Sequence, residues 1–124
     1  MSLALKRAFQ APAAEDGHRV LVDRLWPRGV AKADARIDDW PKEVAPGDAL
    51  RQAFHAGELD WGEFRRRYLA ELKAHRETLR PLAKRAARER VTLVFAAKDE
   101  QHNNAVVLAQ YLAMLEPRLR AESP

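Results

Sequence analysis

VTLVF, residues 91–95, is the stretch of sequence that decides the fold. An apolar, β-branched run of this length predicts a strand buried on both faces, as the central strands of parallel sheets are. RVLV, residues 19–22, is a second run of this kind, and residues 3–9 alternate partly and predict a further strand. The chain is therefore expected to build a small sheet around two buried strands.

Helical segments are predicted between and after these strands. Asp60 and Glu63 have the spacing of a capping box, which predicts a helix that starts at residue 61. Pro81 is expected in the first turn of a further helix after Thr78, because proline is tolerated there. Asp99 is the expected cap of the last helix. The remaining expected elements are a short helix over 31–36, a short edge strand over 37–40 and a helix over 49–55.

The order of these elements predicts the fold class. Strands that alternate with helices imply an α/β fold with a small, mainly parallel sheet and helices on both faces. No repeat, low-complexity tract or linker divides the chain, so residues 1–124 are expected to form a single domain. Its core is expected over about residues 3–115, and the tail over 117–124 is expected to be loosely ordered.

The composition is typical of a folded protein of the cytoplasm. Hydrophobic residues make up 47% of the chain and charged residues 32%, which argues against disorder. The chain has no cysteine, which excludes disulfides and thiolate metal sites. Lys6 and Arg7 interrupt the apolar N-terminal residues, so a signal peptide is not predicted. A membrane partner is not predicted either, because no apolar run approaches the length of about 18 residues that a membrane-spanning helix needs.

Positive charge is concentrated in one part of the chain. The formal net charge is +4, and residues 61–90 contain ten basic and four acidic side chains. A basic surface attracts phosphate backbones, so nucleic acid is a candidate partner. The alternative is that these arginines and lysines are good helix formers on solvated helix faces.

Polar side chains follow the two strongest strands at the point where each strand ends. The first group contains Asp23, Arg24, Trp26 and Arg28, and the second contains Lys98, Asp99, His102 and Asn103. Ligand clefts of open α/β sheets form beyond the carboxyl ends of the strands. The two groups therefore meet in one cleft if the strands are parallel neighbours, and lie a strand length apart if they are antiparallel.

The cationic side chains of these groups predict an anionic ligand. Arg24 and Arg28 have the geometry to clamp a phosphate or carboxylate in bidentate fashion, with Lys98 adding charge. The alternative for each arginine is an ion pair with Asp23 or Asp99 that braces a loop against a strand.

The remaining polar residues suggest proton transfer and ligand contact. Asp23 and His102 are candidates for acid and base, with Asp99 three residues before His102 and able to orient it. The alternatives are a loop cap for Asp23 and a simple loop hydrogen bond for His102. Asn103 and Trp26 are candidate ligand contacts, although Trp26, like Trp40, is by default a core residue. No metal site is expected and no cofactor is indicated, since the spacings of known metal motifs and of phosphate-binding loops are missing.

Four segments carry a family resemblance. They are RVLVDRLWPRG (19–29), DDWPKEVAP (38–46), FRRRYLAEL (64–72) and VTLVFAAKDEQHNNAVVL (91–108). Together they resemble the YeaO-like family of bacterial domains of unknown function, over nearly the whole chain. The resemblance implies a compact α/β fold and no established activity. It also marks as characteristic the positions Asp23, Arg24, Trp26, Pro27, Arg28, Gly29, Trp40, Lys98, Asp99, His102 and Asn103. This chain departs from the family pattern at Phe95, where members often carry tyrosine, and near Phe9 and Gln10. A phenol or an acid therefore has no role at these positions of this chain.

Three functional hypotheses follow. The first is an enzyme or binding protein for a phosphate-bearing or otherwise anionic small ligand at the strand ends. The second is a nucleic-acid-binding or regulatory module that uses the basic helices over 61–90. The third is a structural or interaction domain whose charged residues pair with one another. The sequence indicates neither the reaction nor the oligomeric state.

Overall fold

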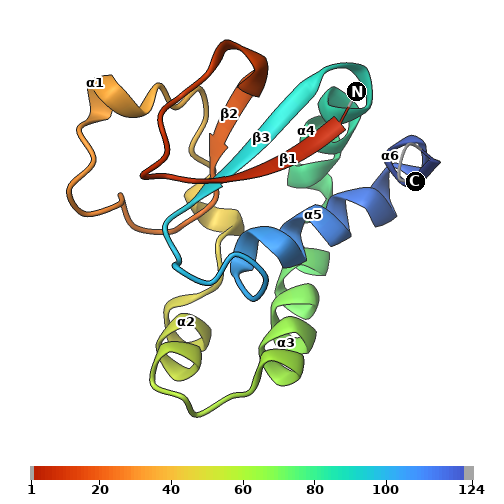
Figure 1. Cartoon of the computed structure of the whole chain (residues 1–124). Helices are drawn as coiled ribbons and strands as arrows, with labels where there is room; N and C mark the ends of the chain where they lie inside the picture. The colour runs from red at the N-terminus through yellow and green to blue at the C-terminus, as the bar shows by residue number, and fades with distance from the viewer. Residues whose placement is uncertain (1, 122–124) are drawn as a thin grey trace.

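The sheet consists of three parallel strands with the VTLVF strand at its centre (Figure 1). The computed structural model describes residues 2–121. Its strands are β1 (Ser2–Arg7), β2 (His18–Leu21) and β3 (Arg90–Phe95), in the order β1-β3-β2. Leu93 of β3 pairs with Leu5 on one side and with Val20 on the other, both in parallel register. The predicted α/β fold with a parallel sheet is confirmed.

Six α-helices surround this sheet within the described residues. They are α1 (Lys32–Ala35), α2 (Asp48–His55), α3 (Trp61–Ala74), α4 (Arg76–Arg88), α5 (Asn104–Leu115) and α6 (Pro117–Ala121). Two 3-10 turns, η1 (Ala14–Asp16) and η2 (Lys42–Val44), lie in the connections. Figure 1 shows α2 and α3 beyond the end of the sheet at which β2 and β3 finish. None of the helices in the described part of the chain is long and apolar enough to cross a membrane.

One face of the sheet carries the main core. Val91, Leu93 and Phe95 alternate along β3 toward this face, as the period of two in a strand requires. They pack with α4 and α5, whose buried residues include Leu79 and Leu108. α3 packs in turn against α5. The long helices therefore form a layer on one side of the sheet and continue past its end.

The other face is covered by the loops that precede and follow α1. Leu21 and Val94 point to this side and pack against Trp26, Ile37 and Trp40. The edge strand expected over residues 37–40 is reduced to a single bridge, between Asp39 and Val20. The backbone there also bonds to β2, because the carbonyl of Asp39 accepts from the N–H of Leu21.

Two helix starts differ from the expectation. α4 begins at Arg76, so Pro81 lies inside the helix and not in its first turn. His75 is both the C-cap of α3 and the N-cap of α4, so the two helices follow one another directly and α4 starts earlier than expected. Asp99 does not cap α5. The cap is Asn103, whose side chain accepts a hydrogen bond of 3.0 Å from the N–H of Val106.

The C-terminal segment is helical as far as it is described. The tail over 117–124 was expected to be loosely ordered, yet Pro117–Ala121 forms α6, and Leu119 is only 7% exposed. Leu119 belongs to the main core, which explains why this turn of helix docks there. The last part of that expectation, residues 122–124, lies outside the described residues.

Candidate functional site

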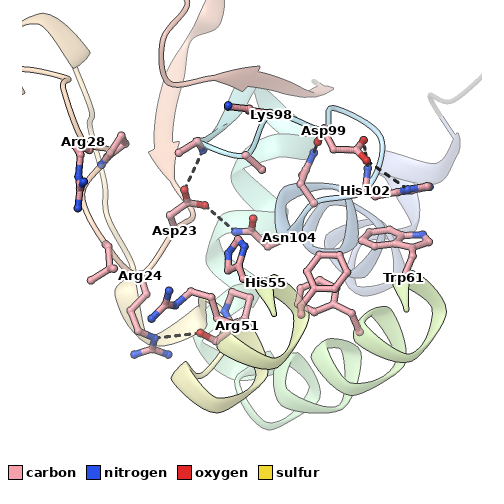
Figure 2. A pocket seen from close by; sticks show the side chains of 18 of the residues that line it. Asp23, Arg24, Arg28, Arg51, His55, Trp61, Lys98, Asp99, His102 and Asn104 are labelled. Carbon is pink, nitrogen blue, oxygen red and sulfur yellow. Dashed lines mark hydrogen bonds and ion pairs between the residues drawn. The ribbon is translucent and has the colours of Figure 1, made fainter. Parts of the chain in front are cut away.

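A cleft opens at the carboxyl ends of β2 and β3 (Figure 2). It has a volume of about 770 Å³, which is within the range of small-molecule sites. Because β2 and β3 are parallel neighbours, the segments that follow them leave the same edge of the sheet. The lining includes all eight residues that the sequence singled out, namely Asp23, Arg24, Trp26, Arg28, Lys98, Asp99, His102 and Asn103. The geometric condition for a common cleft is therefore met.

Asp23 ties the end of β2 to the end of β3 and to the start of α5. Its Oδ2 accepts a hydrogen bond of 2.9 Å from the N–H of Ala96, and its Oδ1 accepts one of 3.0 Å from the side-chain amide of Asn104. Burial raises the pKa of Asp23 above its ordinary value, and the hydrogen bonds from Asn104 and Ala96 and the charge of His55 offset only part of this effect. The carboxylate is thus a structural link that faces the cleft.

The guanidinium of Arg24 is bound by other groups of the protein. Its Nε and Nη2 donate hydrogen bonds of 3.2 and 3.1 Å to the carbonyls of Pro46 and Ala45, and Nε lies 3.8 Å from a carboxylate oxygen of Asp48. Arg24 therefore braces the loop before α2. Its partners are not Asp23 or Asp99, the two acids that the sequence suggested as ion-pair partners.

Three further cationic side chains of the cleft have few partners in the protein: Arg28, Arg51 and Lys98. Within the described residues Arg28 and Lys98 are exposed and make no hydrogen bond or ion pair. Arg51 lies on α2, with its Nη2 3.5 Å from Asp48. Its Nε is buried and has no hydrogen-bond partner in the described part of the chain. A buried guanidinium N–H without a partner is unfavourable, so Arg51 keeps an unsatisfied donor beside the cleft.

The loop between β3 and α5 places Asp99 and His102 at the cleft rim. Asp99 accepts hydrogen bonds from the N–H groups of Gln101 and His102, at 2.9 and 3.0 Å, and these bonds lower its pKa. The imidazole Nδ1 of His102 lies 3.6 Å from a carboxylate oxygen of Asp99. Asn103 is only 2% exposed and is occupied by its capping bonds, which leaves it little capacity to contact a ligand.

Aromatic rings line the part of the cleft formed by α2 and α3. The imidazole of His102 stacks on Trp61, with centroids 4.9 Å apart and an interplanar angle of 26°. Trp61 lies 5.9 Å from Phe64, and Phe64 stacks on Phe54 at 4.2 Å. We term these four rings the aromatic wall. Trp61 and His102 lie on the side of the cleft away from Arg24 and Arg28 (Figure 2).

Trp26 and Trp40 both serve the packing of the second sheet face. Their rings meet edge to face with centroids 5.5 Å apart, and each indole N–H donates to a backbone carbonyl, that of Val30 or that of Asp23. Trp26 also contributes to the cleft lining, whereas Trp40 does not. The default interpretation of both residues as core fits these contacts.

Comparisons with known proteins identify the family. A family model described as the inactive DUF488-N3 subclade matches residues 2–123. The chain belongs to this family. It is also 44% identical over 115 residues to the uncharacterized protein YeaO of Escherichia coli strain K12, covering 93% of this chain and all of that protein. The uncharacterized proteins Mb3100c of Mycobacterium bovis and Rv3073c of Mycobacterium tuberculosis are each 41% identical over 106 residues, covering 86% of this chain and 89% of theirs. No solved structure matches the chain.

In this DUF488-N3 chain, α2 and α3 supply cleft residues that sequence reasoning missed. Arg51, Phe54 and His55 line the cleft from α2, and their spacing of three and four residues was the available signal, since it places them on one helix face. Trp61 and Phe64 of α3 were recognised from the sequence only as an apolar stripe. Among the described residues, no group of three or more metal-ligating side chains is placed to hold an ion.

Proposed function

We propose that the cleft binds a small anionic ligand, with a phosphate-bearing molecule as the preferred class. The observation that carries this proposal is the buried, unpartnered Nε of Arg51 in the cleft lining. Donors of a guanidinium are strong and directional toward phosphate and carboxylate oxygens. A movement of the Arg51 side chain that uncovers this N–H would let an anion in the cleft accept a hydrogen bond from it.

The charge of the lining supports an anion more than a cation. The cationic side chains are Arg24, Arg28, Arg51 and Lys98, and the carboxylates are Asp23 and Asp99. Both oxygens of Asp23 already accept hydrogen bonds from the protein, and Asp99 accepts from two backbone N–H groups. The negative charges are therefore partly compensated, whereas Arg28 and Lys98 are not.

Binding is favoured over catalysis by the placement of the proposed proton-transfer groups. Figure 2 shows Asp23 and His102 well separated, with Asn104 and His55 between them. A catalytic role would require Asp23 and His102, with Asp99 behind His102, to act on one ligand at once. The description of the family as an inactive subclade also favours a binding function.

The nucleic-acid alternative receives less support from the basic helices. Several of their arginines pair with acids three or four residues away in the sequence, namely Arg66 and Arg67 with Glu63, Arg80 with Glu77, and Arg85 with Glu89. The two arginines beside Glu63 lower the pKa of that carboxyl to about 2. These pairs engage four of the ten basic side chains of residues 61–90, which are then less available to a phosphate backbone.

A thermal-shift comparison tests the proposal. Ribose 5-phosphate and ribose differ in the phosphate alone, so only the first is expected to raise the melting temperature. A ligand present at a hundred times its Kd stabilises the folded state by about 2.7 kcal/mol. Arg28→Ala removes an exposed side chain without known partners, and should abolish the stabilisation while leaving the melting temperature of the free protein unchanged. Arg51→Ala is expected to do the same to the ligand effect.

The matched control is Arg88→Ala, which removes an exposed arginine outside the cleft. It should leave the ligand effect intact. Equal stabilisation of wild type, Arg28→Ala and Arg51→Ala would refute the proposal, as would equal effects of ribose and ribose 5-phosphate.

A further inference from the structure

We infer that the ligand of this cleft is a nucleoside 5′-monophosphate, with its base against the aromatic wall and its phosphate near Arg28 and Arg51. This inference rests on the proposed anion site and adds a second recognition element to it. The added element is the aromatic wall of Phe54, Trp61, Phe64 and His102, all of which line the same cleft as the arginines.

The fold does not fully bury the rings of the aromatic wall. Phe64 is buried in the main core, but Phe54 and Trp61 are only partly buried, and the side chain of His102 is 51% exposed. His102 is thus the exposed end of this row of stacked rings, and an aromatic ring exposed at a cleft is a platform on which a nucleobase can stack. The contact of His102 with Asp99 over 3.6 Å leaves the imidazole free to adjust to a ligand.

The wall and the cations stand across the cleft from one another. Figure 2 shows Arg24 and Arg28 on one side, and Trp61 and His102 on the other. A ligand that uses both sides must carry a flat apolar group at one end and an anion at the other. Nucleotides have this division, and the cleft volume of about 770 Å³ accommodates a molecule of that class.

The middle of the cleft suits a sugar. Asp23 and His55 lie between the two sides in Figure 2. A carboxylate has about four acceptor positions, and Asp23 uses two of them, for Ala96 and Asn104. Acceptance of a ribose hydroxyl by a carboxylate just beyond a strand is a common arrangement in α/β folds. The order of groups along the cleft therefore matches base, ribose and phosphate.

NMR titration of the full chain tests this inference. The probes are AMP, GMP, CMP and UMP, with ribose 5-phosphate lacking the base and adenosine lacking the phosphate. At least one nucleotide should bind ten times or more tightly than ribose 5-phosphate and than adenosine. Trp61→Leu should weaken binding of that nucleotide by about 5- to 150-fold and leave the affinity for ribose 5-phosphate unchanged.

Two further variants keep the test decisive. His102→Ala serves in case Trp61→Leu does not fold. It removes an exposed side chain and should weaken binding of the nucleotide without unfolding the protein. Phe9→Leu is the control, because Phe9 is an exposed aromatic residue that does not line this cleft, and it should leave nucleotide affinity unchanged.

The possible results separate the inference from the proposal beneath it. Equal affinities for ribose 5-phosphate and all four nucleotides would overturn the inference and leave the anion site standing. Equal affinities for adenosine and AMP would overturn both, since the phosphate would then contribute nothing, and so would a lack of binding by every probe. A single-stranded tetra-adenylate that binds more than tenfold tighter than AMP would replace the small ligand by a nucleic acid.

Discussion

The side-chain amide of Asn104 donates a hydrogen bond of 3.0 Å to the carboxylate of Asp23. The same amide nitrogen donates a second bond of 3.0 Å to the carbonyl of Val22. These two bonds join the first residue of α5 to the chain just beyond β2, across 81 and 82 residues of sequence. One side of the cleft is thereby fixed relative to the other.

Asn104→Ala is expected to destabilise the protein by about 1–3 kcal/mol. The substitution removes both hydrogen bonds and leaves the partly buried Asp23 with one donor fewer. Urea denaturation measures the effect. Gln101→Ala, in the exposed loop before α5, is the control and should change stability by less than about 0.5 kcal/mol. Equal effects of the two substitutions would contradict the structural role of Asn104.

Asp23→Asn tests the raised pKa of this partly buried carboxyl. Because the folded state raises the pKa of Asp23 above the ordinary value of 3.8, folding favours the protonated form. The stabilising contribution of this carboxyl is therefore fully present below its unfolded pKa and is lost as the pH rises through its folded pKa. The melting temperature of wild type relative to Asp23→Asn should fall over this pH window and stay constant above it.

The other carboxyl groups titrate in both proteins, so they largely cancel in this difference. A relative stability of wild type that increases with pH would mean that the hydrogen bonds from Asn104 and Ala96 outweigh burial and lower the pKa of Asp23.

The parallel sheet and the location of the cleft could be predicted from the sequence. Val91–Phe95 and Arg19–Val22 are too uniformly apolar for a sheet with a solvated face, and polar groups follow both strands directly. The sequence could not decide whether the two strands are neighbours, because strand pairing depends on contacts between distant segments. The parallel register of β2 and β3 settles that question.

The aromatic half of the cleft was not predictable in the same way. Trp61 and Phe64 have the spacing of a core stripe, and nothing local distinguishes a ring that faces the core from one that also borders a cleft. The stacking of His102 on Trp61 joins the loop after β3 to α3, which only the tertiary structure reveals. The cap of α5 was misassigned for a different reason. Asp99 and Asn103 are both good caps, and Asp99 instead closes a turn of its own.

Pro81→Ala is expected to stabilise the protein by about 1–3 kcal/mol. Pro81 is exposed and lies in the interior of α4, where its ring nitrogen has no hydrogen to donate to the carbonyl four residues earlier. Alanine restores this donor and removes the steric conflict of the ring with that turn. Chemical denaturation of Pro81→Ala and of the control Lys84→Ala, one turn later on the same helix, measures the difference. No gain in stability would show that α4 accommodates the proline without cost.

Gly17→Ala is expected to destabilise the protein more than Gly57→Ala does. Both glycines have positive φ, of 65° and 76°, so alanine at either position should cost about 1–2 kcal/mol in backbone strain. At Gly17 a Cβ would in addition collide with the backbone carbonyl oxygen of Arg90, at the start of β3, whereas no atom lies near a Cβ at Gly57. Relief of that collision requires movement of the backbone where β2 and β3 start, which should add about 1–3 kcal/mol. Parallel urea denaturation of the two variants measures this added cost, and equal losses of stability would mean that the backbone around Gly17 and Arg90 separates without penalty.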